Sequence, residues 1–184
     1  MKFTIALAQI DPVLGDVQRN LKKHLDFVKR AVRKGADLIL FPELSLTGYT
    51  LRDINLDVAV NPRRSATLQK LASESGNISI VAGGVEESEN FGLHNAAFFF
   101  EDGKLVAVHR KIYPPTYGMF EEMRYFSAGR SVQALDSRLG RLGILICEDL
   151  WHISLPYLLV QDGAQVILGL SASPTRLTGS QENP

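Results

Sequence analysis

Residues 140–151 read GRLGILICEDLW and join an apolar run to an abrupt polar ending. The apolar run has the length of a buried β-strand, and Glu148 and Asp149 follow it directly. In α/β proteins, strand ends that open into turns are where catalytic groups are presented. The only cysteine of the chain, Cys147, therefore occupies a position where chemistry is expected.

On either side of this stretch, apolar runs alternate with segments of helical period. Strands are predicted over residues 3–10, 36–41, 78–85 and 164–170, and Asp102-Gly103 predicts a hairpin between strands over 95–101 and 104–110. Helices interleaved with strands and a hairpin are typical of an α/β layered fold with a mixed sheet.

Three helices are expected between these strands. Leucine and valine recur at helical spacing from Leu21 to Val32, and Gly35 ends that pattern. A second helix is predicted to begin near Asn61-Pro62, because asparagine caps helices and proline suits their first turn. A third helix is expected between residue 148 and Gly163.

Length, charge and cysteine content exclude several classes of protein. The chain has 184 residues, 20 basic and 20 acidic side chains, and therefore no formal net charge. This argues for one domain and against a nucleic-acid or anionic-membrane partner. No apolar run approaches the roughly 20 residues of a membrane helix, and one cysteine excludes an internal disulfide framework and a cysteine-cluster metal site. A cytoplasmic protein is expected.

Two segments stand out from this pattern. The last predicted strand is nearly all apolar, so both of its faces need cover, yet residues 171–184 are polar and show no hydrophobic period. We therefore expect either a partner over this strand or a missing part of the protein. Residues 112–131 form a long connection, and such loops are usually functional or disordered.

Glu43, Lys111 and Cys147 each end a predicted strand. Taken singly, each has a structural explanation: a helix cap for the glutamate, a solvated strand end for the lysine, a small buried residue for the cysteine. Together they supply a base, an oxyanion stabiliser and a nucleophile, the groups needed for acyl transfer through a thioester. A parallel sheet would gather such strand ends on one edge, although periodicity alone does not show that they meet.

These segments, in this order, resemble the nitrilase superfamily of carbon–nitrogen hydrolases. The resemblance rests on GADL at 35–38, FPEL at 41–44, TGY at 47–49, NAA at 95–97, RK at 110–111 and ICEDLW at 146–151. It implies that residues 1–184 form a single four-layer α-β-β-α sandwich, incomplete at its C-terminus because family members continue further. It also implies no metal or organic cofactor, and a homodimer or higher homo-oligomer formed through helical faces.

The resemblance assigns roles to individual residues. Glu43 becomes the general base, Lys111 the group that holds the tetrahedral oxyanion, and Cys147 the nucleophile. Glu122, eleven positions after the lysine, matches the second carboxylate of the family, which orients the site; a surface carboxylate is the alternative. The backbone amide of Glu148 completes the oxyanion hole.

Within the family, residues 111–126 (KIYPPTYGMFEEMRYF), 147–151 and 171–174 (SASP) resemble the glutaminase domain of glutamine-dependent NAD synthetases. That resemblance places Tyr117 and Ser173 against the substrate, although a packed loop aromatic and a simple turn explain them equally. Trp151 is expected in a pocket wall or in the core.

The expected function is hydrolysis of a small carboxamide or related non-peptide C–N bond through a cysteine thioester, with release of ammonia or an amine. The rival hypothesis is a catalytically silent binding or assembly module, which the early stop of the chain favours. A nucleotide-binding domain is disfavoured because residues 11–16, DPVLGD, contain one glycine and no phosphate loop.

Overall fold

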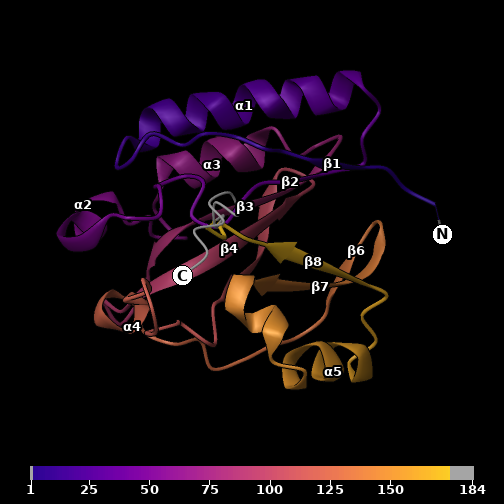
Figure 1. The fold of residues 1–184 in the computed structure, drawn as a ribbon. Coiled ribbons are helices and arrows are strands. Elements are labelled where there is room, and N and C mark those ends of the chain that lie inside the picture. The colour runs from indigo at the N-terminus through magenta and orange to yellow at the C-terminus, as the bar shows by residue number, and fades with distance from the viewer. Residues whose placement is uncertain (1, 175–184) are drawn as a thin grey trace, which may run out of the picture.

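Two β-sheets face each other, and helices cover their outer sides (Figure 1). The structure is a computed structural model that describes residues 2–174. Its larger sheet has the order β1-β2-β3-β4-β5, with bounds Ile5–Leu7, Leu38–Leu40, Ser79–Glu87, Leu93–Glu101 and Lys104–Arg110. The smaller sheet has the order β6-β7-β8, with bounds Leu135–Ser137, Gly140–Ile146 and Val166–Leu170.

The helical elements lie between these strands. They are α1 (Val17–Arg33), η1 (Arg52–Ile54), α2 (Asn55–Val58), α3 (Ala66–Ser73), α4 (Glu122–Tyr125), η2 (Cys147–Trp151) and α5 (Ser154–Gln161). No helix within residues 2–174 is both long enough and apolar enough to cross a membrane.

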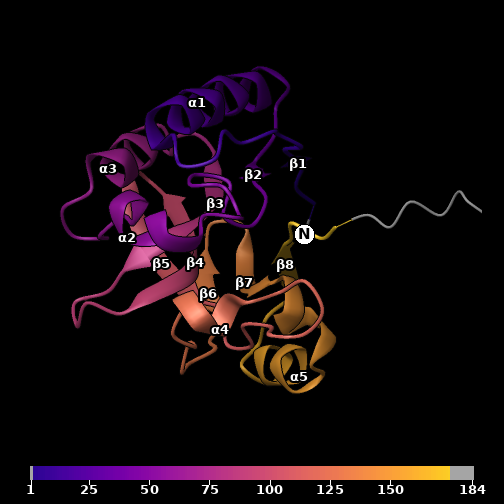
Figure 2. The same cartoon turned by 60° about the vertical axis from the view of Figure 1, so that its left-hand side comes forward.

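The layers follow the order α-β-β-α, as the resemblance implies. Successive residues of a strand point to opposite faces, so Phe98 packs under α1 and α3 while Phe99 packs between the two sheets. Ile144 and Leu168 of the smaller sheet complete that inner layer. On the far side, Leu159 of α5 packs against β7, which gives the fourth layer (Figure 2).

Both sheets are mixed. Strands β1, β2 and β3 run parallel, and β4 and β5 continue the sheet antiparallel. Asp102 and Gly103 both have positive φ, at 50° and 76°, the conformation that a two-residue hairpin turn requires. The hairpin prediction is therefore confirmed.

The predicted start of the second helix is wrong. Helix α3 begins at Ala66, where the Ser65 hydroxyl caps it by accepting from the amide of Leu68 at 3.3 Å. The side chain of Asn61 instead accepts from the amide of Arg63 at 3.0 Å and makes a local turn. Asparagine is favoured in such turns as well as at helix caps. Asn61 alone therefore did not show where the helix begins.

Other predicted elements differ in their ends. The strands predicted at 3–10, 36–41 and 164–170 shorten to β1, β2 and β8, and the apolar strand expected before Glu148 ends at Ile146. The single helix expected after it divides into η2 and α5, and β6, η1, α2 and α4 were not predicted. Of the polar C-terminal stretch, residues 175–184 lie outside the described residues.

Strand β8 receives more cover than expected. Its Leu168 and Leu170 are buried between the sheets, and Ile167 packs against the cluster under α5. Segments that precede β8 in the chain therefore supply both faces.

Candidate active site

Glu43 lies in the turn that follows β2, directly on top of the larger sheet. Gly83 of β3 allows this approach, because a Cβ there would lie 2.7 Å from the carbonyl oxygen of Pro42 and 2.5 Å from the amide nitrogen of Leu44. Glu43 is 3% exposed, and its Oε2 accepts from the amide of Ala172 at 3.0 Å. Both carboxylate oxygens therefore have defined partners.

Lys111, the residue that follows β5, lies between two carboxylates. Its Nζ is 2.8 Å from Oε1 of Glu43 and 2.7 Å from Oε1 of Glu122, and its side chain is 1% exposed. Glu122 is the first residue of α4 and is also buried. The explanations of Lys111 as a solvated strand end and Glu122 as a surface carboxylate are thus wrong.

Two further side chains complete this cluster. Asn95 of β4 donates from Nδ2 to Glu43 at 2.8 Å and to Glu122 at 3.3 Å, and the hydroxyl of Tyr49 donates to Glu122. In the sequence, both residues lie in family motifs, and no role was predicted for either. The sequence does contain a signal for Asn95, which is a polar residue in an apolar strand. A buried amide needs hydrogen-bond partners, so such a residue indicates a polar cluster.

Cys147 begins η2 with a positive φ of 44°. A non-glycine residue held in this region costs free energy, and such strain is concentrated at functional sites. Its Sγ lies 3.9 Å from the hydroxyl of Ser173, which is 2.6 Å from the hydroxyl of Ser171. The strained turn projects a half-buried thiol beside two hydroxyl groups.

The electrostatics of the site link the thiol to the buried cluster. Burial raises the pKa of Glu43, and the charge of Lys111 opposes that rise. Burial and then the charge of Glu43 raise the pKa of Cys147, while the Ser171 hydrogen bond and the charge of Lys111 lower it. Burial alone would lower the pKa of Lys111, but the two carboxylates raise it above its ordinary value. Lys111 is therefore held as an ammonium.

The elements that carry these groups are joined through Asp149, which is fully buried. Its Oδ1 accepts from the amides of Ile112 and Tyr113, both at 3.0 Å. Its Oδ2 accepts from the amide of Ile146 at 3.2 Å and lies 3.0 Å from Nε2 of His109. One carboxylate thus fixes the segment after Lys111 to the turn that carries Cys147.

The predicted gathering of strand ends occurs in a different form. Glu43 and Lys111 come from the larger sheet, on strands whose neighbours run both parallel and antiparallel, whereas Cys147 follows β7 of the smaller sheet. The site forms where the two sheets face each other. The prediction that these residues gather on one edge of a parallel sheet is therefore wrong.

The other residues predicted to line the site are Ser173, Tyr117 and Trp151. Ser173 is near Cys147, and the exposed Tyr117 donates its hydroxyl to Glu148 at 2.6 Å. Trp151 is 81% exposed, so the core alternative for it is wrong. Within residues 2–174, no group of three or more His, Cys, Asp or Glu side chains could hold a metal ion.

Comparisons with known proteins agree with this geometry. The carbon–nitrogen hydrolase family model matches residues 4–182. A glutamine-dependent NAD(+) synthetase from Thermotoga maritima is 36% identical over 94% of this chain, and one from Acinetobacter baylyi is also 36% identical over 94%. The chain spans about a third of these relatives, 30% and 32% of their lengths.

Solved structures show the same similarity. The glutamine-dependent NAD+ synthetase from Acinetobacter baumannii superposes with a TM-score of 0.84 and 36% identity, over 96% of this chain and 34% of that one. An amidase from Nesterenkonia sp. AN1, in which acrylamide has added to the active-site cysteine, gives a TM-score of 0.80 and 26% identity, over 92% of this chain and 67% of that one.

Proposed function

The chain belongs to the carbon–nitrogen hydrolase family of the nitrilase superfamily, and from this premise we propose that it releases ammonia from glutamine or a related small carboxamide. The observation that carries the proposal is the buried Glu43–Lys111–Glu122 cluster beside the strained thiol of Cys147. The similarity to glutamine-dependent synthetases favours glutamine over other amides, and it supports Cys147 as the nucleophile.

The first half of the proposed reaction forms a thioester. The carboxylate of Glu43 takes the proton of Cys147 as sulfur attacks the amide carbon, and its raised pKa makes it a stronger base for this transfer. Lys111 and the amide of Glu148 stabilise the oxyanion. Glu43 returns the proton to the leaving nitrogen, and the C–N bond breaks.

The second half hydrolyses the thioester. Glu43 removes a proton from water as the water oxygen attacks the acyl carbon. The C–S bond then breaks, Glu43 returns the proton to sulfur, and the carboxylic acid leaves. Glu122 holds Lys111 in place through the 2.7 Å ion pair. No metal or organic cofactor enters this scheme.

Three residues are proposed to shape the substrate pocket. Ser173 lies beside the sulfur, Tyr117 is fixed by Glu148, and Trp151 forms the outer wall, consistent with its exposure. We assign only the ammonia-releasing step to residues 1–184, as one carbon–nitrogen hydrolase domain, and we place it in the cytoplasm.

The proposal is tested by looking for a covalent acyl adduct on Cys147. Intact mass spectrometry after acid quench should show a glutamyl thioester on the wild-type protein, and coupled assays should show ammonia release. Cys147→Ala should lose both while its circular dichroism spectrum is unchanged. Asparagine, carbamoyl amino acids and aliphatic amides form the comparison panel. A wild-type protein without adduct or ammonia from any of these would favour the silent binding module.

A further inference from the structure

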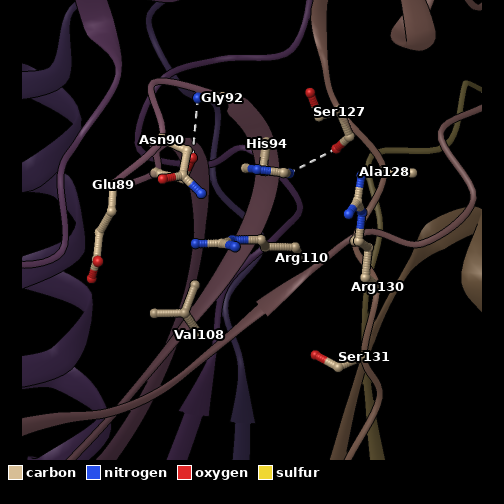
Figure 3. Close-up of a pocket in the computed structure, with 12 residues that line it drawn as sticks. Glu89, Asn90, Gly92, His94, Val108, Arg110, Ser127, Ala128, Arg130 and Ser131 are labelled. Atoms are coloured by element: carbon tan, nitrogen blue, oxygen red, sulfur yellow. Dashed lines mark hydrogen bonds between the residues drawn. The ribbon is translucent and has the colours of Figure 1, made fainter.

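A cavity of about 750 Å³ lies at the open edge of the larger sheet (Figure 3). Strands β4 and β5 form one wall through His94 and Arg110, and the loop at 127–131 forms the other. None of its lining residues is Glu43, Lys111, Glu122 or Cys147. The cavity is therefore a separate candidate site, with a volume within the range of small-molecule pockets.

The loop is held close to the strand by a specific contact. The amide of Gly129 donates to the carbonyl of Lys111 at 2.7 Å, and a Cβ at Gly129 would lie 2.1 Å from the carbonyl oxygen of Arg110. Only glycine permits this approach. The wall that carries Ser127, Arg130 and Ser131 is thus fixed in position.

Hydrogen-bonding groups face the cavity from both walls. Arg110 uses Nε and Nη2 to bind Glu86 at 2.6 and 2.7 Å, which leaves Nη1 available. In the part of the chain that the structure describes, no hydrogen bond or ion pair engages the side chains of Arg130, Ser127 or Ser131. One lining residue is acidic: Glu89 pairs with Arg63, and Glu86, which is not in the lining, pairs with Arg110. The cavity therefore keeps the positive charge of Arg130.

His94 adds a ring nitrogen to the same site. The residue is 8% exposed, and its Nδ1 lies 2.7 Å from the carbonyl oxygen of Ser127, to which it donates. Among residues 2–174, its Nε2 has no hydrogen-bond partner. A Cβ at Gly92 would lie 3.3 Å from Nε2 and 3.2 Å from the hydroxyl of Ser88. The absence of a side chain there keeps the space beside Nε2 open.

We propose that this cavity binds a small phosphate-bearing molecule. Two guanidinium groups and serine hydroxyls reach it from different directions, which suits the tetrahedral oxygens of a phosphate better than the two coplanar oxygens of a carboxylate. The cavity is large enough to hold more than the phosphate alone.

The position predicts that this ligand does not compete with the amide substrate. His94 directly precedes Asn95, and Arg110 directly precedes Lys111. Because consecutive residues of a strand point to opposite faces, the cavity and the buried carboxylate cluster lie on opposite sides of the same strands. Binding should therefore survive chemical blockage of Cys147.

Calorimetric titration of pyrophosphate into the full chain, before and after alkylation of Cys147, tests the proposal. Arg130→Gln should weaken binding by at least about tenfold, since a charge-assisted hydrogen bond is lost. Ser131→Ala should weaken it by a smaller factor. Arg33→Gln, an exposed arginine of α1 that does not line the cavity, is the matched control and should bind as the wild type does. Succinate should bind more weakly than pyrophosphate.

Three outcomes would overturn the proposal. One is the absence of saturable pyrophosphate binding at millimolar concentration, and another is equal affinity in Arg130→Gln and Arg33→Gln. The third is loss of binding after Cys147 is alkylated, which would place the anion in the amide site instead. Because Arg130 is exposed and its side chain makes no hydrogen bond or ion pair with the described residues, its variant is expected to fold normally.

Discussion

The ammonium of Lys111 lies 2.8 Å from Glu43 and 2.7 Å from Glu122, with almost no solvent access. Two carboxylates this close would repel each other strongly in a buried site without a cation between them. Lys111 thus has a structural role in holding the two carboxylates together, in addition to the proposed oxyanion role. A single substitution of Lys111 would remove both roles at once, so its effect on activity would not distinguish them.

A double variant separates them. Lys111→Met should destabilise the fold by about 3–5 kcal/mol, because it leaves buried carboxylates without their partner. Adding Glu122→Gln removes one of those charges and should recover part of the lost stability in urea unfolding. Amide hydrolysis should stay reduced by about 10²-fold or more in both proteins. Recovery of activity together with stability would contradict an oxyanion role for Lys111.

At the scale of elements, Asp149 connects the segment after β5 to η2 with four hydrogen-bonding contacts. Asp149→Asn replaces one accepting oxygen with a donor amide, which leaves buried backbone N–H groups unsatisfied at about 1–3 kcal/mol each. We expect slower thioester formation in stopped-flow mass spectrometry, with substrate affinity changed less. Wild-type rates in a destabilised variant would show that Asp149 stabilises the fold without positioning Cys147.

Helix α1 is fixed to the turn after Glu43 by His24. Its Nδ1 lies 2.8 Å from the carbonyl oxygen of Asn20 and its Nε2 2.9 Å from the hydroxyl of Ser45. Burial lowers the pKa of His24 from 6.5 to about 4. Below pH 6.5 the unfolded chain therefore binds a proton at His24 that the folded chain does not, so stability falls as pH falls.

This effect predicts a specific pH dependence of unfolding. Between pH 7 and pH 5, His24 should contribute a loss of about 2 kcal/mol to the free energy of unfolding. Urea titrations at both values should show that loss in the wild type and a clearly smaller one in His24→Gln. If the two proteins lose equal stability, another group carries the acid sensitivity.

The elements themselves were predictable where local chemistry acts alone. Apolar runs located the principal strands, and Asp102-Gly103 located the hairpin turn. Asn61 and Ser65 show the limit: both residue types can cap a helix, but in the structure only Ser65 caps α3 and Asn61 makes a local turn. Short elements such as β6 and α4 have too few residues to show a period, so sequence patterns could not reveal them.

At the scale of the molecule, the candidate site depends on contacts that no local pattern contains. Glu43 and Lys111 were picked out at strand ends, and the family resemblance added Glu122 and gave each residue its role. The structure brings all three together. Asn95, Tyr49 and Asp149 act through partners 27 to 73 residues away. Such pairs form because the two sheets pack face to face, and the hydrophobic period of a single sequence does not predict that packing.

The outer surface beside α5 leads to a prediction about assembly. Ile153, Tyr157 and Val160 recur at helical spacing and are 86%, 61% and 55% exposed, next to the exposed Trp151. Contiguous exposed apolar side chains often mark protein–protein contacts, and a stripe along one helix can pair with its own copy across a two-fold axis. We expect a homodimer formed through α5.

Light scattering coupled to size-exclusion chromatography should therefore give twice the chain mass of 20.3 kDa. Tyr157→Glu places a charge in the stripe and should yield monomers. Leu56→Glu is the matched control, because Leu56 of α2 is 63% exposed and lies away from α5 in the fold. That variant should stay dimeric. A monomeric wild type, or dimers that persist in Tyr157→Glu, would exclude α5 as the interface.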